Sequence, residues 1–570
     1  MKLKQMTVKN FRGISGDKTT ISFEKSEIIF LIGQNNTGKS SLLVAYKYLT
    51  TAKQVAVITD FYDNDTSTPI EIEAVFTKEP GDESKFKKKG LEKWVDDKHE
   101  IRLRRIWNSV GPGQKETWSP EEGKFVPDGF GGFDTIFQSM APKAIYIPAM
   151  PKEEDLTKCI NEVIKSKVLK SLSNEEEELC NEIAEQIRSL QSKVFSHDSV
   201  TSINDTVNEA FTKVFPTLAL QILCDDNQSI DVSKFIEKDF RVHVTDNGRG
   251  GDWTQRITSY GHGVIRQAIF NFLGLIDQDA AKGLGEKSDT KEFLLLFEEP
   301  EIYLHPTSIF RTRKMLYELC EGTPFQILCA SHSPSLIDLS RPHNSLIRVQ
   351  KESEGKVYLH QIGDDVFAKD EQRKDRVQMI NRFNPHICES FFVDNVILVE
   401  GDTEAIVVRH IVAQKWPNEE VYVLNTGSKN NMPFFQEVFN RFRINYHVIH
   451  DCDTKYIYDS NANVKQTREG RDRVNPAWAL NQQIMKQVSE GRRAHSVGAY
   501  RYVHVENFEC AHDYEYDNAK GKPLSAFEFA QDLDGTGDTR IEVILRQIFG
   551  ELERENFDTE EMLWEANGKR

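Results

Sequence analysis

Two stretches of the 570-residue chain combine residue types and spacings that suit phosphate chemistry. The first is GQNNTGKS at residues 33–40, which fits the pattern G-x-x-x-x-G-K-[ST] completely. It follows the apolar run Ile28 to Ile32 and precedes a helical pattern that begins near Lys39. A phosphate-binding loop requires this context of strand, glycine loop and helix. The sequence therefore predicts a nucleotide site near the N-terminus.

Each residue of the loop has an expected role. The glycines let backbone N–H groups wrap around a phosphate, and the N-terminus of the following helix adds favourable polarity. Lys39 is expected to reach the β- and γ-phosphates of ATP, while the Ser40 hydroxyl is expected to ligate Mg²⁺. The residues predicted to bind the nucleotide in this loop are Gly33, Asn35, Asn36, Thr37, Gly38, Lys39, Ser40 and Ser41.

A pair of carboxylates follows an apolar run later in the chain. Residues 293–299 read FLLLFEE, which predicts a buried parallel strand that ends in Glu298 and Glu299. Open α/β sheets bind ligands at such carboxyl ends of strands. Glu298 is expected to hold the Mg²⁺ shell, and Glu299 to orient the attacking water as general base. Residues 327–334, ILCASHSP, place His332 at the end of the next strand.

The second stretch is an acidic constellation in the last third of the chain. Residues 391–404 read FFVDNVILVEGDTE, in which an apolar strand ends at Glu400 and Glu404 follows one helical turn later. Residues 446–453, YHVIHDCD, place Asp451 and Asp453 two positions apart, so that on a strand both face the same side.

Carboxylates gathered in this way are hard oxygen ligands, which suit Mg²⁺ or Mn²⁺ better than zinc. Residues 501–509, RYVHVENFE, add Glu506 and Glu509 just after another strand-like run. Two metal ions at such a cluster could serve the attacking and the leaving oxygen of a phosphodiester. The residues predicted to bind metal are Glu400, Glu404, Asp451, Asp453 and Glu509, with Ser40 at the nucleotide.

The pattern of elements predicts an α/β protein with two or three domains, because 570 residues exceed one compact core. Strand and helix patterns alternate before residue 155 and again after Arg256, and helical periodicity with an acidic cluster at Glu175 to Glu178 lies between them. A loop-rich connector is expected near residues 351–383. The predicted layout is an ATPase in two parts (1–155 and 251–385), a helical insertion or dimerisation arm (156–250), and a smaller α/β domain (386–570).

Composition narrows the class of protein. Hydrophobic residues make up 39% and charged residues 28%, and no apolar run approaches the length of a membrane span. The first ten residues carry charge without an apolar region, so no signal peptide is expected. The eight cysteines form no C-x-x-C pair, which argues against zinc modules and disulfides and favours the cytoplasm.

The formal net charge of −17 is opposite to the basic surface that is typical of DNA-binding domains. Three basic stretches stand out: residues 85–89 (KFKKK), 102–105 (RLRR) and 465–473 (KQTREGRDR). For each of them a solvated loop is favoured over a DNA contact. Composition alone does not reveal DNA binding.

Taken together and in order, the first set of motifs resembles the ATPase shared by RecF, SMC-like and OLD (overcoming lysogenization defect) proteins. The resemblance rests on VKNFRGIS, the phosphate loop, the SYGHGVIRQ loop at 259–267, LLLFEEPEIYLHP and ASHSP. It implies an ABC-type ATPase in which His332 senses the γ-phosphate, Arg12 contacts nucleotide, and Ser259 and Gly261 belong to a signature loop. That loop contacts ATP bound to the opposite subunit, so the resemblance also implies a dimer or a dimer of dimers.

The order Glu400-Gly401, Gly427 and Asp451-x-Asp453 is similar to the Toprim fold, and Glu404 with the NFE element favours its OLD branch. Lys522 lies where OLD-like chains carry a lysine that stabilises the transition state, although a solvated loop lysine fits equally well. The resemblance extends to anti-phage defence nucleases, among them the Gabija nuclease subunit and retron-associated OLD nucleases.

This resemblance implies an ATP-controlled, metal-dependent DNA endonuclease, with a helicase or a reverse transcriptase and its noncoding DNA as further partners. The alternative is a RecF- or SMC-like DNA-binding ATPase whose Toprim domain is an inert interaction module. A topoisomerase or primase is less favoured, because neither a strand-transferring tyrosine domain nor a zinc module is evident.

Overall fold

The computed structural model divides into two compact units, the first comprising Met1–Asp338 with His343–Leu359 and the second Leu339–Pro342 with His360–Arg570. The residues that the structure describes are 1–15, 19–24, 26–79, 82–167, 198–213, 215–224, 240–246, 254–275, 292–321, 323–339, 344–352, 355–367, 386–460 and 463–566, with 372, 375 and 379.

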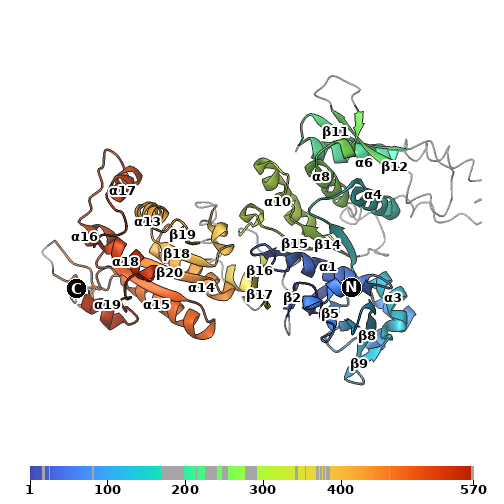
Figure 1. Ribbon diagram of the computed structural model, residues 1–570, viewed down its shortest axis with the longest axis horizontal. Helices are drawn as coiled ribbons and strands as arrows, with labels where there is room; N and C mark the ends of the chain where they lie inside the picture. The colour runs from blue at the N-terminus through green and yellow to red at the C-terminus, as the bar shows by residue number, and fades with distance from the viewer. Residues whose placement is uncertain are drawn as a thin grey trace, which may run out of the picture. The chain divides into compact units, whose positions relative to one another are not determined.

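The first unit contains a six-stranded, largely parallel sheet of order β10-β14-β15-β3-β16-β17 (Figure 1). Its central strands are continuous apolar runs because both faces of the sheet are covered, and every residue of β3 is buried. The strands are β3 (Ile28–Ile32), β10 (Lys143–Ile147), β14 (Phe293–Glu298), β15 (Phe325–Ala330), β16 (Asn344–Lys351) and β17 (Val357–Ile362).

A second sheet of this unit is antiparallel and has the order β2-β1-β5-β6-β8-β9. Helix α1 (Lys39–Thr50) packs against strands of both sheets, so one apolar core joins them. The strands are β1 (Lys2–Lys9), β2 (Thr19–Ser22), β5 (Ile70–Thr77), β6 (Glu100–Trp107), β8 (Gln114–Ser119) and β9 (Lys124–Pro127).

The remaining elements of the first unit include helices that pack on one another, such as α8 against α4 and α6. They are β4 (Val55–Ala56), β7 (Gly111–Pro112), α2 (Glu83–Lys89), α3 (Gly129–Met140), α4 (Glu153–Lys167), α6 (Asp198–Thr212), β11 (Leu218–Cys224), β12 (Phe240–Asp246), β13 (Thr254–Arg256), α8 (His262–Leu273) and α10 (Pro306–Cys320).

Two sequence-based expectations for this unit are corrected. The insertion expected to be helical also contains β11 and β12, an antiparallel pair in which alternate residues such as Val242 and Val244 are buried. The connector expected to be loop-rich near 351–383 contains β17, because Val357 packs into the main core. The acidic cluster at Glu175 to Glu178 lies outside the described residues.

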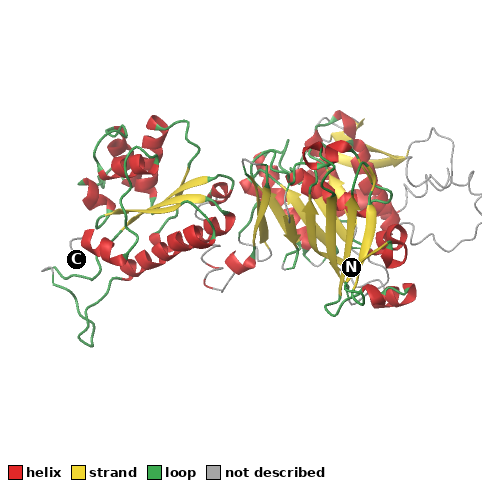
Figure 2. Ribbon diagram, turned by 60° about the horizontal axis from the view of Figure 1, so that its bottom comes forward, coloured by secondary structure: helices red, strands yellow, loops and turns green. Residues whose placement is uncertain are grey.

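The second unit is built on a four-stranded parallel sheet of order β19-β18-β20-β21. Figure 2 shows helices on both of its faces. Helices α13, α17 and α18 contribute to one core, and α14 and α15 pack together against β20 and β21. The elements are α11 (Asp364–Phe367), β18 (Asn395–Val399), α13 (Asp402–Lys415), β19 (Tyr422–Asn425), α14 (Met432–Phe442), β20 (Asn445–Asp451), α15 (Pro476–Ala494), β21 (Ala499–His504), α16 (Phe508–His512), α17 (Lys522–Gln531), α18 (Arg540–Ile548) and α19 (Glu560–Ala566).

None of the helices formed by the described residues is long and apolar enough to cross a membrane.

Candidate nucleotide and metal sites

The glycine loop lies between β3 and α1, as the sequence predicted. Gly33 has φ +140°, and a Cβ built there would lie 2.4 Å from the Val349 carbonyl oxygen, so a side chain has no room. Lys39 folds back over the loop and donates hydrogen bonds to the carbonyl oxygens of Gly33 (3.0 Å) and Gln34 (2.6 Å). Burial lowers the pKa of Lys39 to about 8, and the charges of Glu299 and Glu301 oppose this shift. The loop is thus already closed around a cation that can meet a phosphate.

The other predicted loop residues differ in exposure. Asn35 and Asn36 are exposed, whereas Thr37 is buried and its hydroxyl donates to the Gln34 carbonyl (3.0 Å). Ser41 is partly buried within the first turn of α1, which follows Gly38 at φ +98°.

Ser40 and Glu298 meet, although 258 residues separate them in the sequence. The Ser40 hydroxyl donates a hydrogen bond to Glu298 Oε1, and Tyr146 of β10 donates to Glu298 Oε2 (2.7 Å). A hydroxyl and a carboxylate that converge beside a phosphate loop are oxygen donors of the type that Mg²⁺ prefers. Sequence reasoning missed Tyr146, whose only signal was an aromatic residue in a strand next to β14.

Glu299 follows β14 with φ +45°, and its side chain lies 3.5 Å (Oε1–Nε2) from His332 at the end of β15. Burial and the charge of Lys39 lower the pKa of His332, which favours the neutral ring. Glu301 was not predicted. Its Oε1 accepts from the backbone N–H of His332 (2.7 Å) and from the Ser331 hydroxyl (3.0 Å), which fixes the loop that carries the histidine.

Arg12 lies in the turn after β1, which ends at Lys9, and has φ +54°. Its Nε donates to Asp60 Oδ1 (3.0 Å), and the guanidinium packs over the rings of Phe11 and Tyr48. The side chain is therefore engaged within its own unit, and a nucleotide contact stays a prediction.

The signature-like loop precedes α8, with Ser259 in a short 3-10 helix and Gly261 at the N-cap of α8. Both residues are exposed. Their contact with the nucleotide of an opposing subunit also stays a prediction.

In the second unit, neighbouring parallel strands bring two predicted ligands together. Glu400 follows β18 and Asp451 ends β20, and the Asp451 backbone N–H donates to Glu400 Oε1 (2.8 Å). An open cleft of about 490 Å³ is lined by residues that include Glu400, Glu404, Asp451, Asp453, Glu509, Lys429 and Lys522. The structure thus gathers every metal ligand predicted for this domain around one cleft.

The expectation that Asp451 and Asp453 share one face of a strand was wrong. Strand β20 ends at Asp451, and Asp453 has φ +56°, which is incompatible with an extended strand. The chain turns because Asp453 N–H bonds to the Glu506 carbonyl (2.8 Å) in the loop after β21. Asp453 reaches the cleft through this turn.

The cleft is strongly unfavourable for unbalanced negative charge. Burial, followed by the charges of Glu400 and Asp453, raises the pKa of Asp451 to about 8. Burial is also the main cause that raises the pKa of Glu400 to about 7 and that of Glu404 well above its usual value. Asp451 Oδ1 and Glu404 Oε1 are buried and have no hydrogen-bond partner among the described residues. Unpaired buried carboxylate oxygens of this kind fit a divalent cation.

The carboxylates are not arranged around a common point. No group of three His, Cys, Asp or Glu side chains in the described parts of the chain could hold a metal ion as placed. Two of the carboxylates are held by other contacts. Glu404 Oε2 accepts from the Gly401 backbone N–H (2.9 Å), and Asp453 Oδ2 accepts from Lys429 (2.5 Å). The donor set fits Mg²⁺ or Mn²⁺ by its chemistry, but Glu404 and Asp453 must turn to complete it.

Lys429 was missed by sequence reasoning. It belongs to the turn after β19, where Gly427 has φ +72°, and it is buried. Its only signal was a lysine in the GSKNN turn next to an acidic strand end. Lys522 begins α17 and is exposed, with its ammonium 5.2 Å from the centre of the Tyr516 ring. Glu509 lies in the first turn of α16.

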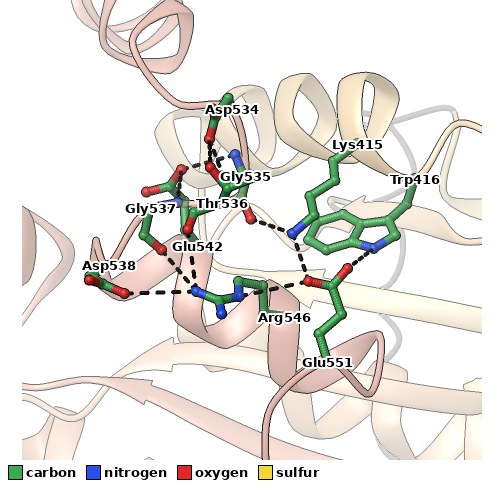
Figure 3. A network of polar contacts seen from close by, with 10 residues as sticks. All are labelled: Lys415, Trp416, Asp534, Gly535, Thr536, Gly537, Asp538, Glu542, Arg546 and Glu551. Carbon is green, nitrogen blue, oxygen red and sulfur yellow. Dashed lines mark hydrogen bonds and ion pairs between the residues drawn. The ribbon is translucent and has the colours of Figure 1, made fainter.

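A polar network fixes the helix that carries Glu404 (Figure 3). At the far end of α13, Lys415 donates to the Gly535 carbonyl (2.8 Å) and pairs with Glu551 (2.7 Å). The loop that contains Gly535 is held in turn by the buried Glu542 of α18, which accepts from the backbone N–H groups of Gly535 (2.9 Å) and Gly537 (3.2 Å).

Two family models match the chain. The model described as "AAA ATPase domain" matches residues 1–110 and 140–337, and the model described as "Overcoming lysogenization defect protein-like, TOPRIM domain" matches residues 391–453. The second match runs from the residues before β18 to Asp453, and so includes four of the five predicted ligands.

Among curated relatives, the Old nuclease of Escherichia phage P2 is 24% identical over 473 residues, which are 80% of this chain and 77% of that protein. Endonuclease GajA of Bacillus cereus (strain VD045) is 24% identical over 516 residues, 84% of this chain and 78% of that protein.

Similar solved structures include the Smc head bound to the C-winged helix domain of ScpA (14% identity, TM-score 0.42, 65% of this chain and 100% of that chain). Another is the recombination mediator protein RecF (13% identity, TM-score 0.35, 63% of this chain and 97% of that chain). The chain belongs to the AAA ATPase domain family, whose model matches more than half of its residues, and joins this ATPase to a TOPRIM domain of the overcoming lysogenization defect (OLD) type.

Proposed function

We propose that the protein is an ATP-binding DNA endonuclease that cleaves phosphodiester bonds at the TOPRIM cleft with Mg²⁺ or Mn²⁺. The observation that carries the proposal is the cleft itself, where the partly buried Glu400 and Asp451 lie with the buried Glu404, and where Asp451 Oδ1 and Glu404 Oε1 have no hydrogen-bond partner among the described residues. An inert interaction module has no need of such a costly arrangement of charge. The names of the two relatives, a nuclease and an endonuclease, agree with this proposal.

Divalent ions bound at the cleft would supply a water of lowered pKa and positive charge at the phosphate. The side chains of the chain would divide the remaining work. Glu400 and Asp451, on adjacent strands, would hold the ions from one side, with Glu404 and Asp453 turned inward and Glu509 facing them. Lys522 is exposed at the rim and has no carboxylate partner among the described residues, so it is free to approach a phosphate. A cation so placed stabilises the charge that develops in the transition state.

In the ATPase unit, Lys39 and Ser40 would hold the phosphates and Mg²⁺ of ATP together with Glu298. Glu299 would accept a proton from the attacking water while the neutral His332 senses the γ-phosphate. Because Ser259 and Gly261 are exposed, we propose that they contact ATP on a second copy of the chain, which makes the working form a homo-oligomer. We further propose a cytoplasmic role in defence against phage, alone or with a helicase or reverse transcriptase.

The decisive experiment incubates the purified full-length protein with supercoiled plasmid, with and without Mg²⁺ or Mn²⁺, and with each nucleotide. We expect metal-dependent nicked or linear product from the wild type and none from Glu400→Ala. Lys39→Ala should lose ATP binding and alter the nucleotide response while keeping the metal cleft. Lys53→Ala, which removes an exposed lysine outside the loop, is the matched control.

If the wild type shows no metal-dependent cutting under any nucleotide, the DNA-binding ATPase with an inert TOPRIM module replaces this proposal. Cutting by Glu400→Ala at the wild-type rate would show that the reaction takes place elsewhere.

A further inference from the structure

A basic segment of the chain extends from the edge of the TOPRIM cleft and returns to the same edge. We define the basic arm as residues 454–475. It begins directly after Asp453 and ends at Asn475, the N-cap of α15, whose Pro476 and Ala477 line the cleft. Both ends of the arm therefore border the same cavity, so the arm lies next to any ligand that reaches the carboxylates.

The described residues of the arm (454–460 and 463–475) have a defined backbone structure. Three short extended stretches pair with one another through the bridges Tyr456–Val474, Tyr458–Val464 and Gln466–Asp472. Backbone hydrogen bonds link the same stretches, with Lys465 N–H donating to the Ile457 carbonyl (2.8 Å) and Arg473 N–H to the Lys465 carbonyl (2.8 Å). A turn at Thr467 to Gly470 places Arg468 at the tip.

The base of the arm is anchored to the TOPRIM unit. Lys455 pairs with Glu560 of α19 (3.4 Å) and lies over the ring of Trp564 at 4.4 Å. Glu560 also accepts from the indole N–H of the buried Trp478 of α15 (3.1 Å). These contacts hold the base of the arm beside the cleft.

The charge of the arm is opposite to that of the whole chain. Residues 454–475 contain five basic and three acidic side chains, in a protein with a formal net charge of −17. Arg471 pairs with Glu469 at 3.3 Å, but both side chains are solvated and such pairs contribute little. Lys465, Arg468 and Arg473 are exposed, and their side chains make no hydrogen bond or ion pair with any residue that the structure describes.

We infer that the basic arm is a binding surface for the phosphate backbone of a nucleic acid, which it holds across the metal cleft. This inference rests on the proposed function and adds the surface that positions the substrate. Long cationic side chains contact phosphates without reading sequence, so the arm supplies affinity and register rather than specificity. From sequence, a solvated loop was favoured for residues 465–473. That prediction could not take into account that both ends of the arm border the cleft.

The test compares two full-length variants that each lose three positive charges. The first is Lys465→Gln/Arg468→Gln/Arg473→Gln in the arm. The control is Lys87→Gln/Lys88→Gln/Lys89→Gln, which removes three exposed lysines from α2 in the ATPase unit. Binding to labelled duplex and single-stranded DNA of equal length is measured by anisotropy in EDTA over a range of salt concentrations, together with plasmid cutting in Mn²⁺.

For every phosphate that the protein no longer neutralises, the slope of log K against log salt falls by about 0.9 for duplex DNA and by about 0.7 for single strands. The arm variant should therefore lose about 1–3 from the wild-type slope and bind at least about tenfold more weakly near 0.1 M salt. The control should match the wild type, and Lys465→Arg/Arg468→Lys/Arg473→Lys should restore the slope. The preferred form of DNA is the one that shows the larger loss.

A slope in the arm variant equal to that of the control overturns the inference, and if the plasmid is still cut the proposed nuclease function stands. The arm would then be assigned to the binding of an acidic protein surface instead. If the wild type neither binds nor cuts DNA, both proposals fail.

Discussion

The ammonium group of Lys429 lies 2.5 Å from Asp453 Oδ2 and also donates a hydrogen bond to the main-chain carbonyl of Asp451. A buried lysine thus occupies the part of the cleft where a metal ion would meet Asp453. Lys429 is thus an internal counter-ion of Asp453, and under the proposed function a divalent ion that binds Asp453 Oδ2 would have to displace it.

Lys429→Met should lower the stability of the metal-free protein and increase the stabilisation that metal provides. We expect a loss of about 1–3 kcal/mol without metal, below the cost for a fully buried pair, because the Asp453 side chain is 30% exposed. Thermal unfolding with EDTA and with Mn²⁺ measures both effects, and Mn²⁺ should raise the melting temperature more than it does in the wild type. Lys522→Met is the control, and equal Mn²⁺ responses in all three proteins would contradict the competition.

Asp451→Asn should change how stability depends on pH. The folded-state pKa values of Glu400 (about 7) and Asp451 (about 8) lie above the ordinary values of 4.5 and 3.8. At these two carboxyl groups the folded protein binds more protons than the unfolded chain within this window, so their contribution to the free energy of unfolding falls as pH rises from about 4 to 8.

Without metal, Asp451→Asn should accordingly be more stable than the wild type at pH 8.5, by an amount on the order of a few kcal/mol, and nearly equal to it at pH 4. Denaturant unfolding in EDTA at the two pH values tests this. Excess Mn²⁺ should reverse the order at pH 8.5. A stability difference between Asp451→Asn and the wild type that does not grow between pH 4 and pH 8.5 would disprove the assignment.

The strand ends were predictable from sequence, whereas the contacts between distant loops were not. Apolar runs that end in Gly33, Glu298 and Glu400 are buried on both faces, and this burial leaves a direct trace in the sequence. Parallel pairing then brings such ends to one edge of a sheet.

Asp453 and Lys429 illustrate what the sequence could not show. The backbone of Asp453 turns because its N–H donates to the carbonyl of Glu506, which lies more than fifty residues later. This turn brings the Asp453 carboxylate into contact with the buried Lys429. Tyr146 and Glu301 were missed for the same reason, since their partners come from other strands. Strands β11 and β12 were missed because short alternating runs were outweighed by the helical patterns around them.

Glu299→Gln should separate ATP binding from ATP hydrolysis. Lys39 and Ser40 keep their contacts in this variant, so nucleotide affinity should be close to that of the wild type. Loss of a general base lowers turnover by about 10²- to 10⁴-fold. Phosphate release and fluorescent-nucleotide binding measure the two quantities, and Glu318→Gln on the exposed side of α10 is the control. A fall in affinity as large as the fall in turnover would assign Glu299 to binding instead.

Glu542→Ala should loosen the loop that supports α13. The buried carboxylate accepts from Gly535, Gly537 and the Thr539 hydroxyl (2.6 Å), and its removal leaves these donors without their acceptor. We expect a loss of about 2–4 kcal/mol in the stability of the TOPRIM unit. Hydrogen exchange at residues 534–539 should accelerate together with exchange in α13, whereas Asp538→Ala, at a fully exposed side chain, should change neither. Faster exchange confined to the loop would show that α13 is supported elsewhere.

The network of Figure 3 also has a consequence for the order of events on the ribosome. Lys415 and the Glu551 that pairs with it are 136 residues apart, so the helix bearing Glu404 is synthesised long before its support. At about 5–20 residues per second the delay is on the order of ten seconds. Nascent chains stalled before Glu551 should leave α13 open to protease. The nucleotide loop, which packs against Val349, can therefore be completed before the support of the acidic cleft exists, and the cleft stays unfinished until translation is nearly complete.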